Sequence, residues 1–339
     1  MNELILSFFE EGNKMKGTTL YHLLRGRRTN SVLVYGFFHG VLPYLGAFPK
    51  LEESLIKKIL KNHCSKGFLV EHDGEYQLTD EGRRALKKNA LRFPDIDYFS
   101  FGKTASMNWR LVKFAVQVVS YISYGENEYV PIETSPYYTI QVKNWLKRQE
   151  KAQLPTQIKT ELATIFKQLS DTQVTFLSNQ FSGRQIDGSV VYQLLPKTMQ
   201  EFPYNQLFED EAIHAFFRQL KKIPESILYA LVKEGLKQNY NQSARQTIRL
   251  FLQGATKEQV MQIRHIKTST INDHLIEWAI VDETFPFQRF ISREAQVHLS
   301  QLDQPMLTWQ YAEINERFSI SYDSFRLFQI REYRKRGQK

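Results

Sequence analysis

The chain has 339 residues, 42% of them hydrophobic and 24% charged, which is the composition of an ordinary globular protein with room for two or three domains. Its formal net charge of +9 permits binding to polyanions such as DNA without requiring it. The single cysteine, Cys64, excludes an intrachain disulfide and a cysteine-based zinc site.

The start of the chain reads MNELILSFFEEGN and has acidic residues where a secretory signal peptide needs basic ones. No apolar run reaches 18 residues, the length typical of a membrane helix; Trp109–Tyr124 comes closest but contains Arg110 and Lys113. We therefore expect a cytoplasmic protein with no membrane partner.

Residues 1–92 are predicted to form a winged helix, which is three helices followed by a β-hairpin. Helices are expected near Thr18–Arg25, from Thr29 or Asn30 through VLVYGFF, and from about Leu51 to Lys66. The runs FLVEH and EYQLT flank the dipeptide Asp73-Gly74, the strongest hairpin signal in the sequence.

Basic side chains mark a candidate DNA surface on this domain. Arg27 and Arg28 precede the second helix, and Lys57, Lys58 and Lys61 form one face of the third. Such side chains suit contacts to phosphate groups. Acidic residues also lie near the third helix and in the hairpin, so a solvated or protein-binding face is the alternative.

Residues 93–103 are predicted to be a linker, because Pro94 interrupts them and they lack hydrophobic periodicity. The triplet Gly102-Lys103-Thr104 ends like a phosphate-binding loop, but Asp97 stands where that motif requires a glycine and no strand precedes it. Residues 104–240 are predicted to form a helical middle domain, to which we assign no chemistry.

Residues 241–333 are predicted to form a helix-turn-helix domain. A first helix ends at Gly254, and Thr256 with Gln259 makes a capping-box pattern at the start of a second helix. Val260, Met261 and Ile263 are expected on the inner side of that helix. His265 falls at the tight turn, and the third helix begins at Thr268 or Ser269.

The third helix of this motif is predicted to contact DNA through its first turn. Lys267, Ser269, Thr270 and Asn272 are expected to face outward, together with Asp273, and suit hydrogen bonds to phosphates and base edges. Three short helices with a tight turn also occur in domains that bind proteins or only pack, and that remains the alternative. Residues 334–339 are predicted to be a disordered basic tail.

The pattern TIRLFLQGAT…TSTINDHL, from Thr247 to Leu275, resembles the helicase-type helix-turn-helix of the YpbB family. The segments LYHLLRGRRTNSV and YGFFHGVLPYLGAF near the start, and WRLVKFAVQVVS…EYVPI in the middle, also resemble that family. The resemblance implies a stand-alone protein without a helicase motor, encoded beside a RecQ-type helicase, and implies such a helicase as a partner.

We find no complete phosphate loop, dinucleotide fingerprint, nucleophile elbow or Cys/His ligand cluster. The sequence therefore favours a mainly α, non-catalytic protein that needs no cofactor or metal. It would bind duplex or branched DNA, or a DNA helicase, as an accessory factor in repair or recombination. The alternatives are a DNA-binding transcriptional regulator and a scaffold whose two motifs both bind proteins.

Overall fold

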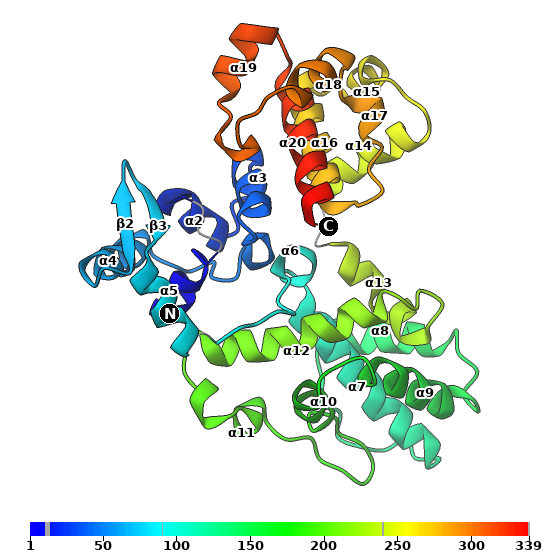
Figure 1. Cartoon of the computed structure of the whole chain (residues 1–339). Coiled ribbons are helices and arrows are strands. Elements are labelled where there is room, and N and C mark those ends of the chain that lie inside the picture. Colours follow the sequence, from blue (N-terminus) through cyan, green and yellow to red (C-terminus); the bar gives the residue numbers. More distant parts are fainter. Residues whose placement is uncertain (11–13, 90, 239–240, 338–339) are drawn as a thin grey trace.

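A computed structural model describes residues 1–10, 14–89, 91–238 and 241–337. The chain is mainly helical, as predicted, and forms an N-terminal, a middle and a C-terminal domain (Figure 1). Within the described ranges, no helix is both long enough and apolar enough to span a bilayer.

The N-terminal domain has the order of a winged helix with two additional helices, α3 and α5. Its elements are α1 (Asn2–Ser7), β1 (Met15–Lys16), α2 (Gly17–Leu24), α3 (Asn30–Phe38), the 3-10 turn η1 (Leu42–Tyr44), α4 (Glu53–Ser65), β2 (Leu69–His72), β3 (Glu75–Leu78) and α5 (Asp80–Asn89). The predicted hairpin is confirmed: β2 pairs with β3, and Asp73 and Gly74 both have positive φ, as a two-residue hairpin turn requires. The strand β1, which pairs Met15 with Tyr76, was not predicted.

The helix α3 is an insertion between α2 and α4, the two helices that pack on each other in the winged helix. The three helices of the winged helix are therefore α1, α2 and α4, and the predicted assignment of α3 to this set is wrong. Buried Val32, Leu33, Val34 and Phe38 make α3 apolar around most of its circumference. A helix of this kind needs partners on more than one side. Here α2 covers one side and α16 of the C-terminal domain covers another.

The middle domain is built around the long helix α7. Its elements are α6 (Tyr98–Phe101), α7 (Ala105–Ser123), α8 (Pro136–Leu146), α9 (Leu154–Phe166), α10 (Asp171–Ser178), α11 (Val191–Leu194), the 3-10 turn η2 (Lys197–Met199), α12 (Tyr204–Leu220) and α13 (Ile227–Lys237). The helices α8, α9, α12 and α13 pack on α7, and Trp109 of α7 contacts Phe216 of α12 edge-to-face. This domain has its own hydrophobic core.

Residues 93–103, expected to be a linker, are instead packed between the N-terminal and middle domains. They contain α6, which Asp97 caps by accepting a hydrogen bond from the Ser100 amide. Tyr98 and Phe99 are buried, and the Tyr98 hydroxyl donates to Asp210 of α12 at 2.6 Å. The helix α6 also packs on η1 of the N-terminal domain, so the junction is a structural contact.

The C-terminal domain surrounds α16. Its elements are α14 (Gln242–Leu252), α15 (Lys257–Arg264), α16 (Thr268–Val281), α17 (Phe287–Phe290), α18 (Arg293–Ser300), the 3-10 turn η3 (Met306–Thr308), α19 (Tyr311–Phe318) and α20 (Tyr322–Gly337). The expected tail begins inside α20, and the Arg334 guanidinium donates to the carbonyls of Ile280 and Asp282 at the end of α16. Residues 338–339 lie outside the described ranges.

One hydrophobic core runs through both the N-terminal and the C-terminal domain. The helix α3 joins the two halves of this core, because it packs on α2, α16 and α20 (Figure 1). Phe37 and Phe38 of α3 stand 5.2 and 5.3 Å from the Tyr333 ring of α20, measured between ring centroids. The two ends of the chain therefore form one packed unit.

Candidate nucleic-acid interface

The local signals of the helix-turn-helix are confirmed in α14, α15 and α16. The chain turns after α14 at Gly254, whose φ is +95°. Thr256 and Gln259 form the predicted capping box, with the Thr256 amide 2.8 Å from the Gln259 side-chain oxygen. His265 takes the left-handed conformation, φ 51° and ψ 41°, and makes the tight turn into α16.

A hydrogen-bonded cluster fixes the angle between the three helices. Arg264 at the end of α15 donates to the Ser243 carbonyl of α14 at 2.6 Å and to the Thr247 hydroxyl. That hydroxyl lies 2.9 Å from the His274 Nδ1 of α16. Burial, together with the nearby Arg264, lowers the pKa of His274 to about 4, so His274 is neutral near neutral pH.

The N-terminus is the most exposed part of α16. Lys267, Thr268 and Ser269 are exposed, and Thr270 is half-buried. Lys267 occupies the N-cap position of α16 without a side-chain capping bond, whereas Asn241 caps α14 and Thr256 caps α15. Backbone N–H groups at an uncapped helix start favour anions, so this turn can bind phosphate.

The body of α16 is covered by the N-terminal domain. Arg28 Nη2 lies 3.0 Å from Glu277 Oε1, and the Asn30 amide donates to Asp273. The same Glu277 also accepts a hydrogen bond from Asn241, at 3.2 Å. Seven of the eight residues from Ile271 to Trp278 that follow the first turn, all but the exposed Asp273, are buried or half-buried. The helix therefore cannot lie lengthwise in a DNA groove while α3 remains docked.

Three predictions about side-chain direction are wrong. Arg28 was expected to face phosphate, but it lies in the α3–α16 contact, paired with Glu277 and stacked over Phe99. Asn272 was expected to face outward, but it is half-buried, and its Oδ1 is shielded with no hydrogen-bond partner among the described residues. Ile263 was expected on the inner side of α15, and it is 59% exposed.

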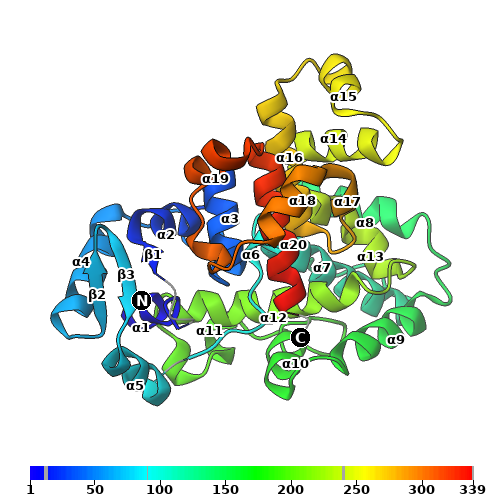
Figure 2. The same ribbon diagram turned by 45° about the horizontal axis from the view of Figure 1, so that its top comes forward.

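The second candidate surface is α4. Its inner face is buried through Ile56, Ile59, Leu60 and His63, and it packs on α1, α2 and β2. Both views place α4 and the β2–β3 hairpin at the outer edge of the molecule (Figures 1 and 2). The predicted basic residues of this helix are exposed, and the structure brings them to one open surface.

The basic residues of the N-terminal domain differ in their partners. Lys57 pairs with Glu53 at 2.7 Å, which partly neutralises its charge, while Lys58 and Lys61 are exposed. Arg27 is also exposed, with Nη1 3.3 Å from the His22 ring. Lys58 and Lys61 are therefore better placed than Lys57 for contacts to phosphate.

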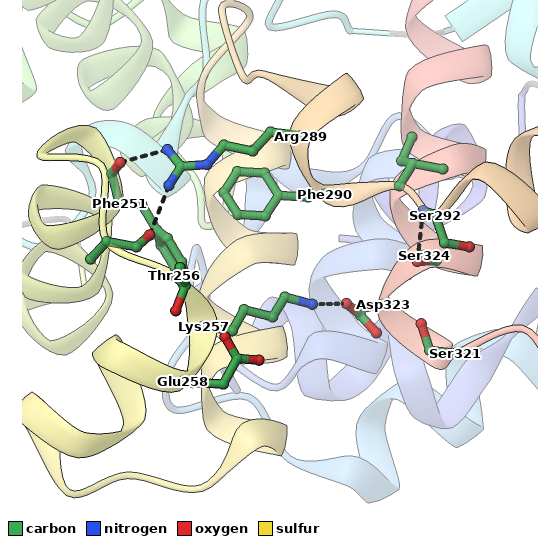
Figure 3. A pocket seen from close by; sticks show the side chains of 12 residues that line it. Phe251, Thr256, Lys257, Glu258, Arg289, Phe290, Ser292, Ser321, Asp323 and Ser324 are labelled. Carbon is green, nitrogen blue, oxygen red and sulfur yellow. Dashed lines mark hydrogen bonds and ion pairs between the residues drawn. The ribbon is translucent and has the colours of Figure 1, made fainter.

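A hollow of about 480 Å³ lies between α15, α17 and α20 (Figure 3). Its two cations hold the domain together: Lys257 pairs with the buried Asp323, and Arg289 donates to the carbonyls of Phe251 and Ala255 at 2.6 and 2.7 Å. These bonds fix α15 against α20 and close the end of α14. The side chains that line the hollow thus stabilise the packing of the helix-turn-helix.

Sequence reasoning missed the residues that position the motif, above all Arg264 and Glu277. One signal for Glu277 was present, because a carboxylate between Leu275 and Trp278 interrupts an otherwise apolar stretch. A charged residue in such a place is paired when it is buried. The sequence gives no indication that its partner is Arg28, because the two residues are far apart in the chain.

Comparison with known proteins agrees with this geometry. Residues 243–329 match a family described as a helix-turn-helix domain. Protein YpbB of Bacillus subtilis (strain 168) is 22% identical over 323 residues, which cover 93% of this chain and 91% of that protein. No solved structure matches the chain. The chain therefore carries a C-terminal helix-turn-helix domain and is similar to Protein YpbB over most of its length.

Proposed function

We propose that this protein is a DNA-binding accessory factor without catalytic activity of its own. The observation that carries the proposal is that α4 exposes Lys58 and Lys61 and the start of α16 exposes Lys267, while the inner face of α4 and most of the body of α16 are packed. Helix surfaces of this kind suit phosphate groups, and the net charge of +9 adds attraction to a polyanion.

The accessible part of α16 suits phosphate contacts better than base reading. Only Lys267, Thr268 and Ser269 are exposed at its start, whereas Asn272, the residue best suited to an adenine edge, is half-buried. Contacts to phosphate position a protein on DNA but carry no sequence information. We therefore propose that DNA structure, such as a fork or junction, governs binding more than base sequence does.

The helix α4 supplies the second contact. In a winged helix the third helix is the one that enters a groove, and here α4 holds that place with Lys58 and Lys61 exposed. The wing beside it carries Glu71 and Glu75, of which Glu75 lies 3.9 Å from Lys16. Acidic residues on the wing repel phosphate, so α4 rather than the wing is the proposed contact of this domain.

The alternative of a transcriptional regulator differs in one measurable property. Fluorescence anisotropy with the full chain should compare two duplexes of unrelated sequence with a forked DNA that contains one of them. We expect equal affinity for the two duplexes and tighter binding to the fork. A preference for one duplex on the order of the 10³-fold seen for specific regulators would favour the regulator and contradict our proposal.

The proposed partner is a RecQ-type helicase, and this part rests on the resemblance to the YpbB family. The test is co-precipitation of the purified chain with a purified RecQ-type helicase from the same organism, with and without nuclease. Capture that survives nuclease treatment would show a protein contact. Capture that is lost on nuclease treatment would show that DNA bridges the two, and no capture would remove the helicase from the proposal. Capture by a chain with no affinity for DNA would favour the scaffold alternative.

The absence of catalysis is itself a proposal. Residues 98–103 carry α6 ahead of Lys103, where a phosphate loop would have a strand and a glycine-rich turn. We expect no DNA-stimulated ATP hydrolysis by the purified chain. Hydrolysis that disappears in Lys103→Ala would contradict the proposal, while hydrolysis that persists in this variant would indicate another site or a contaminating enzyme.

A further inference from the structure

A cleft of about 340 Å³ lies where the N-terminal domain meets α6. It is separate from α4 and from the first turn of α16. Three segments line it: Arg25 to Arg28 after α2, Leu45 to Pro49 after η1, and Tyr98 to Lys103 around α6. Its volume lies within the range of small-molecule sites, roughly 300–1,000 Å³.

The wall between the first two segments is bare backbone. Gly26 and Gly46 have φ of +84° and +81°, and a Cβ on Gly26 would lie 3.1 Å from the Gly46 Cα. The Gly46 amide donates to the Leu23 carbonyl at 2.9 Å, and the Phe48 amide donates to the Leu24 carbonyl at 2.9 Å. Side chains would strain both glycine positions, so a rigid wall without side chains borders the cleft.

The charges around the cleft have one sign. Arg25, Arg28 and Lys103 line it, and no acidic residue is among the lining residues. Hydrogen bonds hold Arg25 in place, from Nε to the Pro49 carbonyl and from Nη1 to the Tyr21 hydroxyl, both at 3.1 Å. Three cations from two of these segments therefore converge on a cleft whose lining contains no carboxylate.

The rest of the lining is apolar. Leu45 and Phe99 are buried, Pro49 is exposed beside them, and the Arg28 guanidinium lies 4.7 Å from the Phe99 ring centroid. We propose that this cleft binds a nucleotide, with its phosphates on the three cations and its ring against the apolar wall. Gly102 and Lys103 take part without forming a phosphate loop, because the cations come from separate segments.

Arg28 connects the cleft to the DNA-binding domain. Its guanidinium lines the cleft and also pairs with Glu277 of α16, Nη2 to Oε1, at 3.0 Å. A phosphate in the cleft competes with Glu277 for this guanidinium, so nucleotide binding weakens the docking of α3 on α16. The same competition predicts that removing the carboxylate charge at position 277 strengthens nucleotide binding.

Isothermal titration calorimetry of the full chain tests the site with ADP, adenosine and inorganic phosphate. We expect ADP to bind, phosphate to bind more weakly, and adenosine to bind at least about tenfold more weakly than ADP, because a charge-assisted hydrogen bond is lost. The proposal would be overturned if neither ADP nor a single strand with a 5′-phosphate binds. Adenosine binding as tight as ADP binding would also overturn it.

Charge variants locate the site. Lys103→Gln and Arg25→Gln should each weaken ADP binding by about tenfold, whereas the control Lys87→Gln on α5 should leave it unchanged. Glu277→Gln, which keeps a hydrogen-bond acceptor for Arg28, should tighten it. Melting temperatures show that each variant is folded. ADP affinity that is unchanged in both Lys103→Gln and Arg25→Gln would exclude this cleft.

The nucleotide could be free or could be the end of a nucleic-acid strand. A short single strand with a 5′-phosphate, compared with the same strand ending in a 5′-hydroxyl, separates the two sources. Tighter binding of the phosphorylated strand, lost in Lys103→Gln, would identify a strand end, and equal binding of the two strands alongside ADP binding would identify a free nucleotide. Neither result depends on α4 or on Lys267, so this proposal and the proposed DNA contacts can fail separately.

Discussion

Arg28 and Glu277 are 249 positions apart in the sequence, yet the Arg28 Nε and the Glu277 Oε1 lie 3.1 Å apart. The pair joins the loop before α3 to the middle of α16. In DNA-binding helix-turn-helix domains, the helix in the position of α16 is the one that lies in the major groove. Docking of α3 therefore limits DNA access to the first turn of α16.

The pair should contribute to the stability of the joined N- and C-terminal domains. Removing one partner of a fully buried pair costs about 3–5 kcal/mol, and the partial exposure of Arg28 reduces this to about 2 kcal/mol for Arg28→Ala. A double-mutant cycle of Arg28→Ala with Glu277→Ala, followed by urea denaturation, measures the coupling. Additive losses in the double variant would show that the two side chains do not interact in solution.

Lys267 and Asn272 should separate DNA contact from packing. Lys267 is exposed at the start of α16, so Lys267→Ala should weaken duplex binding by about 1 kcal/mol without loss of stability. Asn272 is half-buried, so Asn272→Ala should change the melting temperature of the protein and leave its affinity for duplex DNA unchanged. Anisotropy and thermal melting of both variants provide the comparison. The opposite pattern would mean that Asn272 faces DNA.

The two exposed lysines of α4 should determine part of the salt dependence. Replacing Lys58 and Lys61 by Gln should reduce the slope of log affinity against log salt by about 0.9 for each phosphate contact that is lost. Lys87→Gln with Lys88→Gln on α5 is the matched control, with the same change of charge outside α4. Equal slopes in the two double variants would assign Lys58 and Lys61 to general charge alone.

Glu211 on α12 should make stability depend on pH near neutrality. Burial raises the pKa of Glu211 to about 7; the nearby Asp95 carboxylate adds to the shift, while the Asp95 amide and Arg218 oppose it. Because the folded pKa lies above the unfolded value, the stabilisation is present at low pH and is lost as pH rises through 7. Glu211→Gln should therefore be more stable than the parent at pH 8 and similar to it at pH 4.5. A constant difference across this range would contradict the assignment.

Short-range features of the fold could be predicted from the sequence. The Asp73-Gly74 hairpin, the Thr256–Gln259 capping box and the turn at His265 each depend on residues that are close in the chain. Such local signals specify backbone geometry directly. The helix-turn-helix is therefore predictable from the sequence without knowledge of what packs against it.

The docking of α3 could not be predicted in the same way, because its partner lies far along the chain. The run VLVYGFF is apolar around most of the helix, which indicates burial on several sides but does not name what covers it. For the same reason, sequence spacing gave the wrong direction for Arg28 and Asn272. Lys58, Lys61, Lys267 and Ser269 were predicted as exposed site residues, and all four are exposed in the structure.

The proposed DNA contacts on α4 and on the first turn of α16 can be tested by site-specific photo-crosslinking. A benzophenone amino acid would be placed at Lys58, at Ser269 and, as a control, at Tyr124 of the middle domain, which is 53% exposed. Bound to a labelled forked DNA, the proteins carrying the probe at positions 58 and 269 should crosslink to DNA on illumination, and the control should not. Binding without crosslinks at positions 58 and 269, or equally strong crosslinks at position 124, would contradict the proposed contacts.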